Sequence, residues 1–157
     1  MCRARIVTAS AVLGIGCAVT TGGAALASPG AGVTPQTFVT ATLSEEGQVN
    51  HDSVKFQTRA PTVVRMQRLT FAPGARTGWH HHPGVVVVAV ESGSVTLTDT
   101  NCGSKTYGPG SPHGSVFVEG HDHAHEASSL NGATVYVTYV SPSQTFRLED
   151  PPTSCGQ

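Results

Sequence analysis

The stretch GARTGWHHHPGVVVVAVESGSVTLTD, residues 74–99, combines glycine-punctuated turns, three consecutive histidines and an unbroken apolar run. In an extended strand, side chains at positions i and i+2 share a face, while the residue between them points away. His80 and His82 therefore converge, and His81 lies on the opposite side. Because imidazole is a common metal ligand, this pair at a strand end predicts half of a metal site.

The remainder of the chain consists of short runs rich in β-branched and aromatic residues, each bounded by Gly, Pro, Asn or Asp. Beyond the N-terminal segment, no window of about eleven residues shows a helical apolar stripe. We therefore predict an all-β sandwich or barrel. The predicted strands are 38–43, 54–58, 63–71, 85–92, 94–99, 115–119 and 134–140.

The run from Val85 to Val90 is apolar at every position, whereas a strand with one face in water alternates. This pattern predicts that both faces are covered, one by the barrel interior and the other by an N-terminal strand or a second subunit. The second alternative predicts a homodimer. Val86, Val88 and Val90 are the expected lining of an apolar pocket for a small-molecule ligand.

A second histidine cluster, HDHAHE, occupies residues 121–126. If this segment is extended, its three histidines share a face, but at about 3.3 Å per residue the first and last are roughly 13 Å apart. That distance is too large for both to bind one ion. One or two of them are expected to join His80 and His82, and the others fit a solvated, pH-sensitive loop.

The first 27 residues have the features of a signal peptide. Arg3 and Arg5 provide a positive start, an apolar stretch follows, and Ala25-Leu26-Ala27 matches a small-residue cleavage site. The mature chain is expected to begin at Ser28. It is predicted to be secreted, to the cell envelope or beyond, and to have no membrane segment after cleavage.

Removal of Arg3 and Arg5 leaves seven basic residues against ten acidic ones, a balance that disfavours nucleic acid as a partner. Residues 28–36 are predicted to be a flexible linker, and residues 37–157 a single domain. In an oxidising compartment, Cys102 and Cys155 are predicted to form a disulfide that holds the C-terminal tail against this domain. The bridge would close a loop of about 53 residues, for which the chain-entropy relation gives roughly 4 kcal/mol.

The two histidine clusters lie in sequence patterns that resemble those of the cupins. Gly74-x5-His80-x-His82, followed by a Pro-Gly turn and closing at Gly93, is similar to the first cupin motif, G-x5-H-x-H-x3-4-E-x6-G. TYGPG followed by SVFVEGHDHAH is similar to the second motif. The resemblance covers roughly residues 63–140, and the wider frame is similar to small exported single-domain cupins of bacteria.

This resemblance implies a double-stranded β-helix (jelly-roll) barrel, often dimeric, with a divalent metal inside. It implies His80, His82 and His125 as the metal ligands, with His123 as the alternative to His125. The position of the family's glutamate falls on Val86, which cannot bind a metal. Three imidazoles without a carboxylate favour iron, zinc, copper or nickel and disfavour manganese.

Three functional hypotheses follow. The first is a metal-dependent oxidoreductase, dioxygenase-like, or an isomerase acting on a small polar or anionic ligand. Glu126 and Glu119, with His123 and Asp122, are then the nearest candidates for a general acid or base. The second is a non-catalytic barrel that binds a small molecule, with a structural metal or none, and the third, less favoured because the histidines are few, is a metal buffer.

Overall fold

The computed structural model describes residues 30–59, 61–120 and 123–155, and all regular structure within them is β-strand. Within this described part, no helix is long and apolar enough to cross a membrane. The strands are β1 (Ala31–Leu43), β2 (Gln48–His51), β3 (Val54–Gln57), β4 (Thr62–Arg76), β5 (His80–His81), β6 (Val85–Gly93), β7 (Val95–Asp99), β8 (Ser104–Tyr107), β9 (Val116–Glu119), β10 (His125–Ser129), β11 (Ala133–Ser141) and β12 (Leu148–Glu149).

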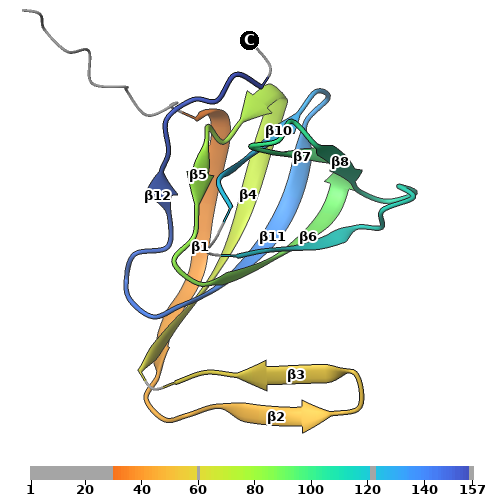
Figure 1. Cartoon of the computed structure of the whole chain (residues 1–157). Helices are drawn as coiled ribbons and strands as arrows, with labels where there is room; N and C mark the ends of the chain where they lie inside the picture. The colour runs from red at the N-terminus through yellow and green to blue at the C-terminus, as the bar shows by residue number, and fades with distance from the viewer. Residues whose placement is uncertain (1–29, 60, 121–122, 156–157) are drawn as a thin grey trace, which may run out of the picture.

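Ten of the strands form one antiparallel hydrogen-bonded system folded into two layers (Figure 1). One layer has the order β1-β4-β11-β6-β9 and the other the order β12-β5-β10-β7-β8. The layers are joined where β10 also pairs with the end of β4, at Ala75 and Arg76. This is a jelly-roll barrel, so the predicted all-β fold class is confirmed.

The core lies between the two layers and follows the two-residue period of the strands. In β6, Val86, Val88 and Val90 are buried, whereas Val85 and Val87 are 49% and 37% exposed. The prediction that both faces of this run are covered by the chain itself is wrong, because the N-terminal strand β1 pairs with β4 instead. Cover by a second subunit stays a prediction.

The predicted linker at residues 28–36 also needs correction. From Ala31 onward the chain is part of β1, which pairs along almost the whole length of β4. Pro35 is tolerated because β1 is an edge strand, where a missing N–H removes no ladder hydrogen bond. Residues 28 and 29 and the predicted signal peptide lie outside the described residues.

Strands β2 and β3 form a hairpin that lies apart from the barrel (Figure 1). Its two ends are joined at the barrel by Gly47 and Thr58, which exchange hydrogen bonds of 2.8 Å and 3.1 Å. One face of the hairpin is largely apolar, with Val49 paired to Phe56, and all its residues are exposed. The hairpin therefore contributes little to the barrel core.

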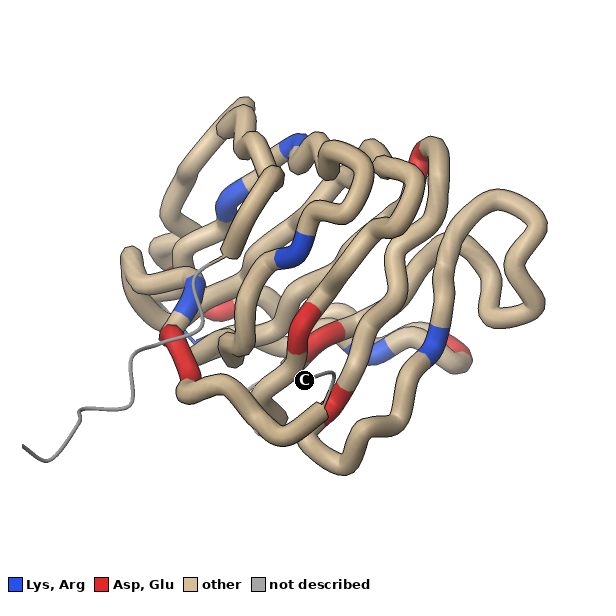
Figure 2. The backbone as a smooth tube through the Cα atoms, turned by 90° about the horizontal axis from the view of Figure 1, so that it is seen from above, with Lys and Arg blue, Asp and Glu red and all other residues tan. Residues whose placement is uncertain are grey.

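Residues 142–155, called the C-terminal strap below, run back over the barrel through β12, which pairs with β5. The strap ends at a disulfide between Cys155 and Cys102, which confirms the predicted bridge. Charged positions are few along the barrel, and acidic and basic ones are interspersed (Figure 2). The strap and the disulfide hold residue 146 and its neighbours next to the histidines of β5.

Candidate metal centre

Three histidines from distant parts of the sequence meet inside the barrel. His80 and His82 lie in and just after β5, and His125 begins β10 directly opposite His80. All three are buried, with exposed fractions of 3–5%. Each offers a ring nitrogen, and these nitrogens lie within 4.8 Å of one another. The two histidine clusters of the sequence therefore supply one site, with His125 as the contribution of the second cluster.

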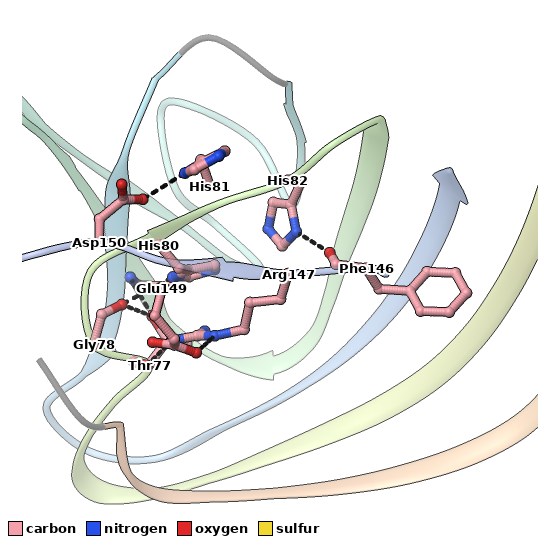
Figure 3. Close-up of polar contacts among 10 residues, drawn as sticks. Thr77, Gly78, His80, His81, His82, Phe146, Arg147, Glu149 and Asp150 are labelled. Carbon is pink, nitrogen blue, oxygen red and sulfur yellow. Dashed lines mark hydrogen bonds and ion pairs between the residues drawn. The ribbon is translucent and has the colours of Figure 1, made fainter. Parts of the chain in front are cut away.

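Each of the three rings is oriented by a backbone carbonyl at Nδ1. The acceptors are the carbonyl oxygens of Gly78 for His80 at 2.8 Å, of Phe146 for His82 at 2.6 Å and of His123 for His125 at 3.0 Å. Because a carbonyl can only accept, Nδ1 carries a proton, and in the neutral ring Nε2 then has its lone pair available. This arrangement is typical of histidines that bind a metal through Nε2. Figure 3 shows the first two of these contacts.

A carboxylate lies between two of the rings. Glu119, at the end of β9, is 8% exposed, and its two oxygens lie 3.2 Å from His82 Nε2 and 3.2 Å from His125 Nε2. Neither ring nitrogen has a partner in hydrogen-bond alignment. The atoms are thus close without pointing at one another.

These distances fit ligands of a common ion. Two ligands bound at about 2.0–2.1 Å with tetrahedral angles lie roughly 3.3 Å apart. Buried Nε2 atoms that lack an aligned partner are costly unless something else satisfies them. The three imidazole nitrogens therefore fit a divalent metal, and the Glu119 carboxylate lies close enough to two of them to join the donor set.

Two histidines of the first motif, His80 and His82, thus converge with His125 of the second motif within a two-layer jelly-roll barrel. The chain has a cupin fold. This confirms the resemblance at the level of the fold.

Comparisons with known proteins found similarity in structure only. No family model matches the sequence, and no curated protein matches it. Similar solved structures include a conserved protein of unknown function from Streptococcus pyogenes, with a TM-score of 0.48 and 15% identity over 71% of this chain and 75% of that one. An RmlC-like cupin from Shewanella frigidimarina has a TM-score of 0.46 and 17% identity over 72% and 78% of the two chains. Salicylate 1,2-dioxygenase from Pseudoaminobacter salicylatoxidans has a TM-score of 0.41 and 13% identity, and the match covers 48% of this chain but 19% of that protein.

The sequence pattern predicted a site without a carboxylate, and the structure has one beside two of the histidines. In the antiparallel pair of β6 and β9, Glu119 lies directly opposite Val86, the position where the family pattern has its glutamate. The carboxylate is therefore present, but on the neighbouring strand. The argument against manganese depended on its absence, so a set of three nitrogens and one oxygen admits manganese beside iron, zinc, copper and nickel.

Glu119 could have been placed in the site from the strand period. In β9 the buried positions are Phe117 and Glu119, and the exposed ones are Val116 and Val118. A glutamate at an inward position of a short apolar strand needs a buried partner. From the sequence, Glu119 is a candidate general acid or base because it is near the histidines along the chain. The strand period further indicates that its side chain points into the barrel.

The surroundings lower the pKa of His80 and Glu119 and raise that of His125. Burial, Arg147 and His125 lower the pKa of His80 to about 3, so this imidazole is neutral. Burial raises the pKa of Glu119, but His125 and His82 outweigh it and lower the pKa to about 2. For His125, burial lowers the pKa, and the facing Glu119 more than reverses this effect and raises it. Glu119 is thus ionised, and its negative charge lies next to the rings of His82 and His125.

The other predicted residues lie around the centre rather than in it. His123 is exposed and contributes its backbone carbonyl, while the ring of His125 enters the site. His81 points away from the other two, as expected, and its Nδ1 lies 2.6 Å from Asp150 Oδ2 of the strap. Glu126 alternates with the inward residues of β10, and Asp122 lies outside the described residues.

A cavity of about 50 Å³ inside the barrel is lined by His80 and His82. Val88 lines it, whereas Val86 and Val90 are buried in the surrounding core and do not, which corrects the predicted lining. Most of the remaining wall is apolar. Its polar groups are contributed by Thr77, His80, His82, Glu119, Tyr139 and Arg147.

Proposed function

We propose that the protein is an exported metal-dependent cupin in which His80, His82, His125 and Glu119 hold one divalent transition metal. The observation that carries this proposal is the pair of 3.2 Å contacts from one buried carboxylate to two Nε2 atoms that lack aligned hydrogen-bond partners. The three backbone acceptors at Nδ1 support it, because a neutral imidazole that donates through Nδ1 has the lone pair of Nε2 free for a metal.

A transition metal in this position supplies a Lewis-acidic centre, and a redox-active one if it is iron, copper or manganese. The chain itself orients the three imidazoles through backbone carbonyls and provides a largely apolar wall beside them. Among the described residues that line the cavity, Glu119 is the only carboxylate, and its two oxygens already contact His82 and His125. A general base independent of the metal therefore has no support, so the reaction we propose is metal-centred: oxidation or isomerisation of a small polar ligand.

The alternative is a barrel that binds a small molecule without turnover. It is supported by the largely apolar wall and the small volume of the cavity, about 50 Å³, which suit binding as well as reaction. The two functions differ in one measurable respect. A metal-dependent enzyme consumes a substrate with the ion present, whereas a binding barrel shows only a ligand-dependent rise in melting temperature.

The first experiment is metal analysis of the full chain produced by export and purified without an affinity tag. Elemental analysis should find one transition-metal ion per chain, and intact mass should show cleavage before Ser28. In the His82→Ala and Glu119→Gln variants the metal content should fall strongly, while in the matched Glu126→Gln variant it should stay at one. A wild-type chain that cannot be loaded with manganese, iron, nickel, copper or zinc at neutral pH would refute the proposed metal centre.

A further inference from the structure

The cavity beside the histidine centre adjoins a larger hollow, with which it shares lining residues. This hollow, called the vestibule below, has a volume of about 450 Å³ and lies between β1, β4 and the C-terminal strap. Thr77, Leu69, Tyr139 and Arg147 line both spaces, so they form the boundary between them. A ligand that reaches the centre from the vestibule passes these residues.

The vestibule is basic although the chain as a whole is not. Arg65, Arg76 and Arg147 line it against a single acidic residue, Glu149, in a chain of formal net charge −1. Arg65 is held in place over the ring of Phe146, 3.8 Å from its centre. A concave surface with one sign of charge concentrates ligands of the opposite sign. The vestibule therefore favours anions.

Arg147 is the arginine that also lines the inner cavity, and Figure 3 shows its polar contacts. Its guanidinium is held by Glu149, through Nε and Nη2, and by the carbonyl oxygen of Thr77 at 2.6 Å from Nη2. Within the described residues its Nη1 donates no hydrogen bond. A fixed guanidinium with one unused nitrogen is preorganised to accept an oxygen of an anion.

Tyr139 provides a second donor at the same boundary. Its ring packs against His82 and Phe146, each at 5.7 Å between ring centres. Its hydroxyl makes no hydrogen bond to any residue that the structure describes. A phenol held this way can donate to a ligand that lies between the vestibule and the centre.

The size of the cavity and the chemistry of its wall limit which anions fit. At about 10–15 Å³ for each water-sized group, a cavity of about 50 Å³ holds roughly three to five non-hydrogen atoms. The wall is otherwise apolar, with Leu69, Phe71 and Phe117 among its members. Two unused donors match the two oxygens of a carboxylate, and the apolar wall matches a short hydrocarbon chain, whereas a phosphate would leave further oxygens unsatisfied.

We propose that the site takes a short-chain carboxylate, whose oxygens accept hydrogen bonds from Arg147 Nη1 and the Tyr139 hydroxyl. The carboxylate thereby lies next to the histidine centre, and this part of the inference rests on the proposed function. Arg147 and Tyr139 are its binding residues, and Glu149 and Thr77 position Arg147.

The test uses acetate and propionate as probes and their neutral analogues acetamide and propionamide as controls. Binding to the exported full chain is measured by saturation-transfer NMR and by titration, on metal-free and on zinc-loaded protein, with zinc content measured in parallel. The variants are Arg147→Met, Arg147→Lys and Tyr139→Phe. Lys105→Met, which removes an exposed charge of β8 outside the cavity and the vestibule, is the matched control.

We expect the wild-type chain to bind the carboxylates and not the amides. Arg147→Met should weaken binding about tenfold or more, because a charge-assisted hydrogen bond is lost, with zinc content unchanged. Tyr139→Phe should have a smaller effect in the same direction, and Lys105→Met none. If Arg147→Met does not fold, Arg147→Lys decides, since it keeps the charge but loses the planar fork and should still weaken binding.

Two results would overturn the inference: equal binding of carboxylates by the wild type and the folded Arg147 variants, or equal binding of amides and carboxylates by the wild type. Failure of the metal proposal is a separate outcome. A chain that holds no zinc refutes the metal centre, while its metal-free titration still shows whether carboxylate binding depends on Arg147.

Discussion

At the residue scale, the central feature is the position of the carboxylate. Glu119 and Val86 face each other across β9 and β6, and directly opposite side chains have Cβ atoms about 4.5–5.5 Å apart. A glutamate at either position can therefore extend toward the same ion. The strand that bears the carboxylate differs from the family pattern, while its place in the barrel is retained.

This equivalence predicts the result of an exchange. Glu119→Val should lower metal affinity by at least the 10- to 100-fold that loss of a supporting group costs, because a ligand is lost. The double variant Val86→Glu/Glu119→Val should regain at least tenfold of that loss. Titration with zinc in competition with a chromophoric chelator measures both values.

The control for the exchange is Val86→Glu alone. It places two carboxylates in one buried site, where like charges repel, so its free energy of unfolding should be lower than that of the wild type. If the double variant binds metal no better than Glu119→Val, the two positions are not equivalent and the site requires β9.

At the element scale, strand period and the resemblance in motif spacing were sufficient to predict the barrel and the three clustered histidines, with His123 left as the alternative to His125. His80 and His82 share a face by alternation alone. The strap was not predictable in the same way, because the contact between His82 Nδ1 and the Phe146 carbonyl joins residues 64 positions apart. No local pattern encodes such a pair.

The hairpin of β2 and β3 was predicted only as one strand, at residues 54–58. Its partner β2 has the sequence QVNH, which is too short and polar for a strand signal. Likewise, β1 begins earlier than predicted because pairing with β4 outweighs the weak strand tendency of Gly and Pro near its start.

Excision of the hairpin should leave the barrel intact. Replacing residues 48–57 by a two-residue turn keeps the hydrogen bonds between Gly47 and Thr58 and removes residues that contribute little to the core. The melting temperature should change by no more than about 3 °C, and the metal content should not change. Loss of cooperative unfolding in thermal denaturation would show that the hairpin supports the barrel.

At the scale of the whole molecule, the outer face of β6 and β9 is a contiguous apolar surface. Val87 faces Val118 across the two strands, and Val85 and Val116 extend the patch, with all four exposed. Such a patch is typical of an interaction surface. The homodimer predicted from the sequence would cover it.

Sedimentation of the purified chain tests this prediction. We expect a dimer for the wild type and a monomer for Val118→Lys, because the substitution places a charge in the apolar patch. Val54→Lys, on the equally exposed hairpin, is the matched control and should remain dimeric. A wild-type chain that sediments as a monomer at every concentration contradicts the prediction.

The disulfide provides a second prediction at this scale. Replacing Cys102 and Cys155 together by serine should lower the free energy of unfolding by roughly 4 kcal/mol, because the bridge restricts a long loop in the unfolded chain. Zinc affinity should fall as well, since the strap carries the carbonyl that orients His82. Denaturant unfolding and zinc titration measure the two effects, and unchanged zinc affinity would show that the strap holds its place without the bridge.

The three carbonyls that orient the imidazoles also impose an order on how the site is assembled. For His80 and His125 the acceptor lies two residues away, so these rings can be oriented as soon as their own turns form. The acceptor for His82 is Phe146, 64 residues further along the chain, so this ring is oriented only after the strap has folded back over the barrel. Orientation of the complete histidine cluster therefore depends on the strap: a chain that stops before residue 146 has its histidines without the group that orients the third ring.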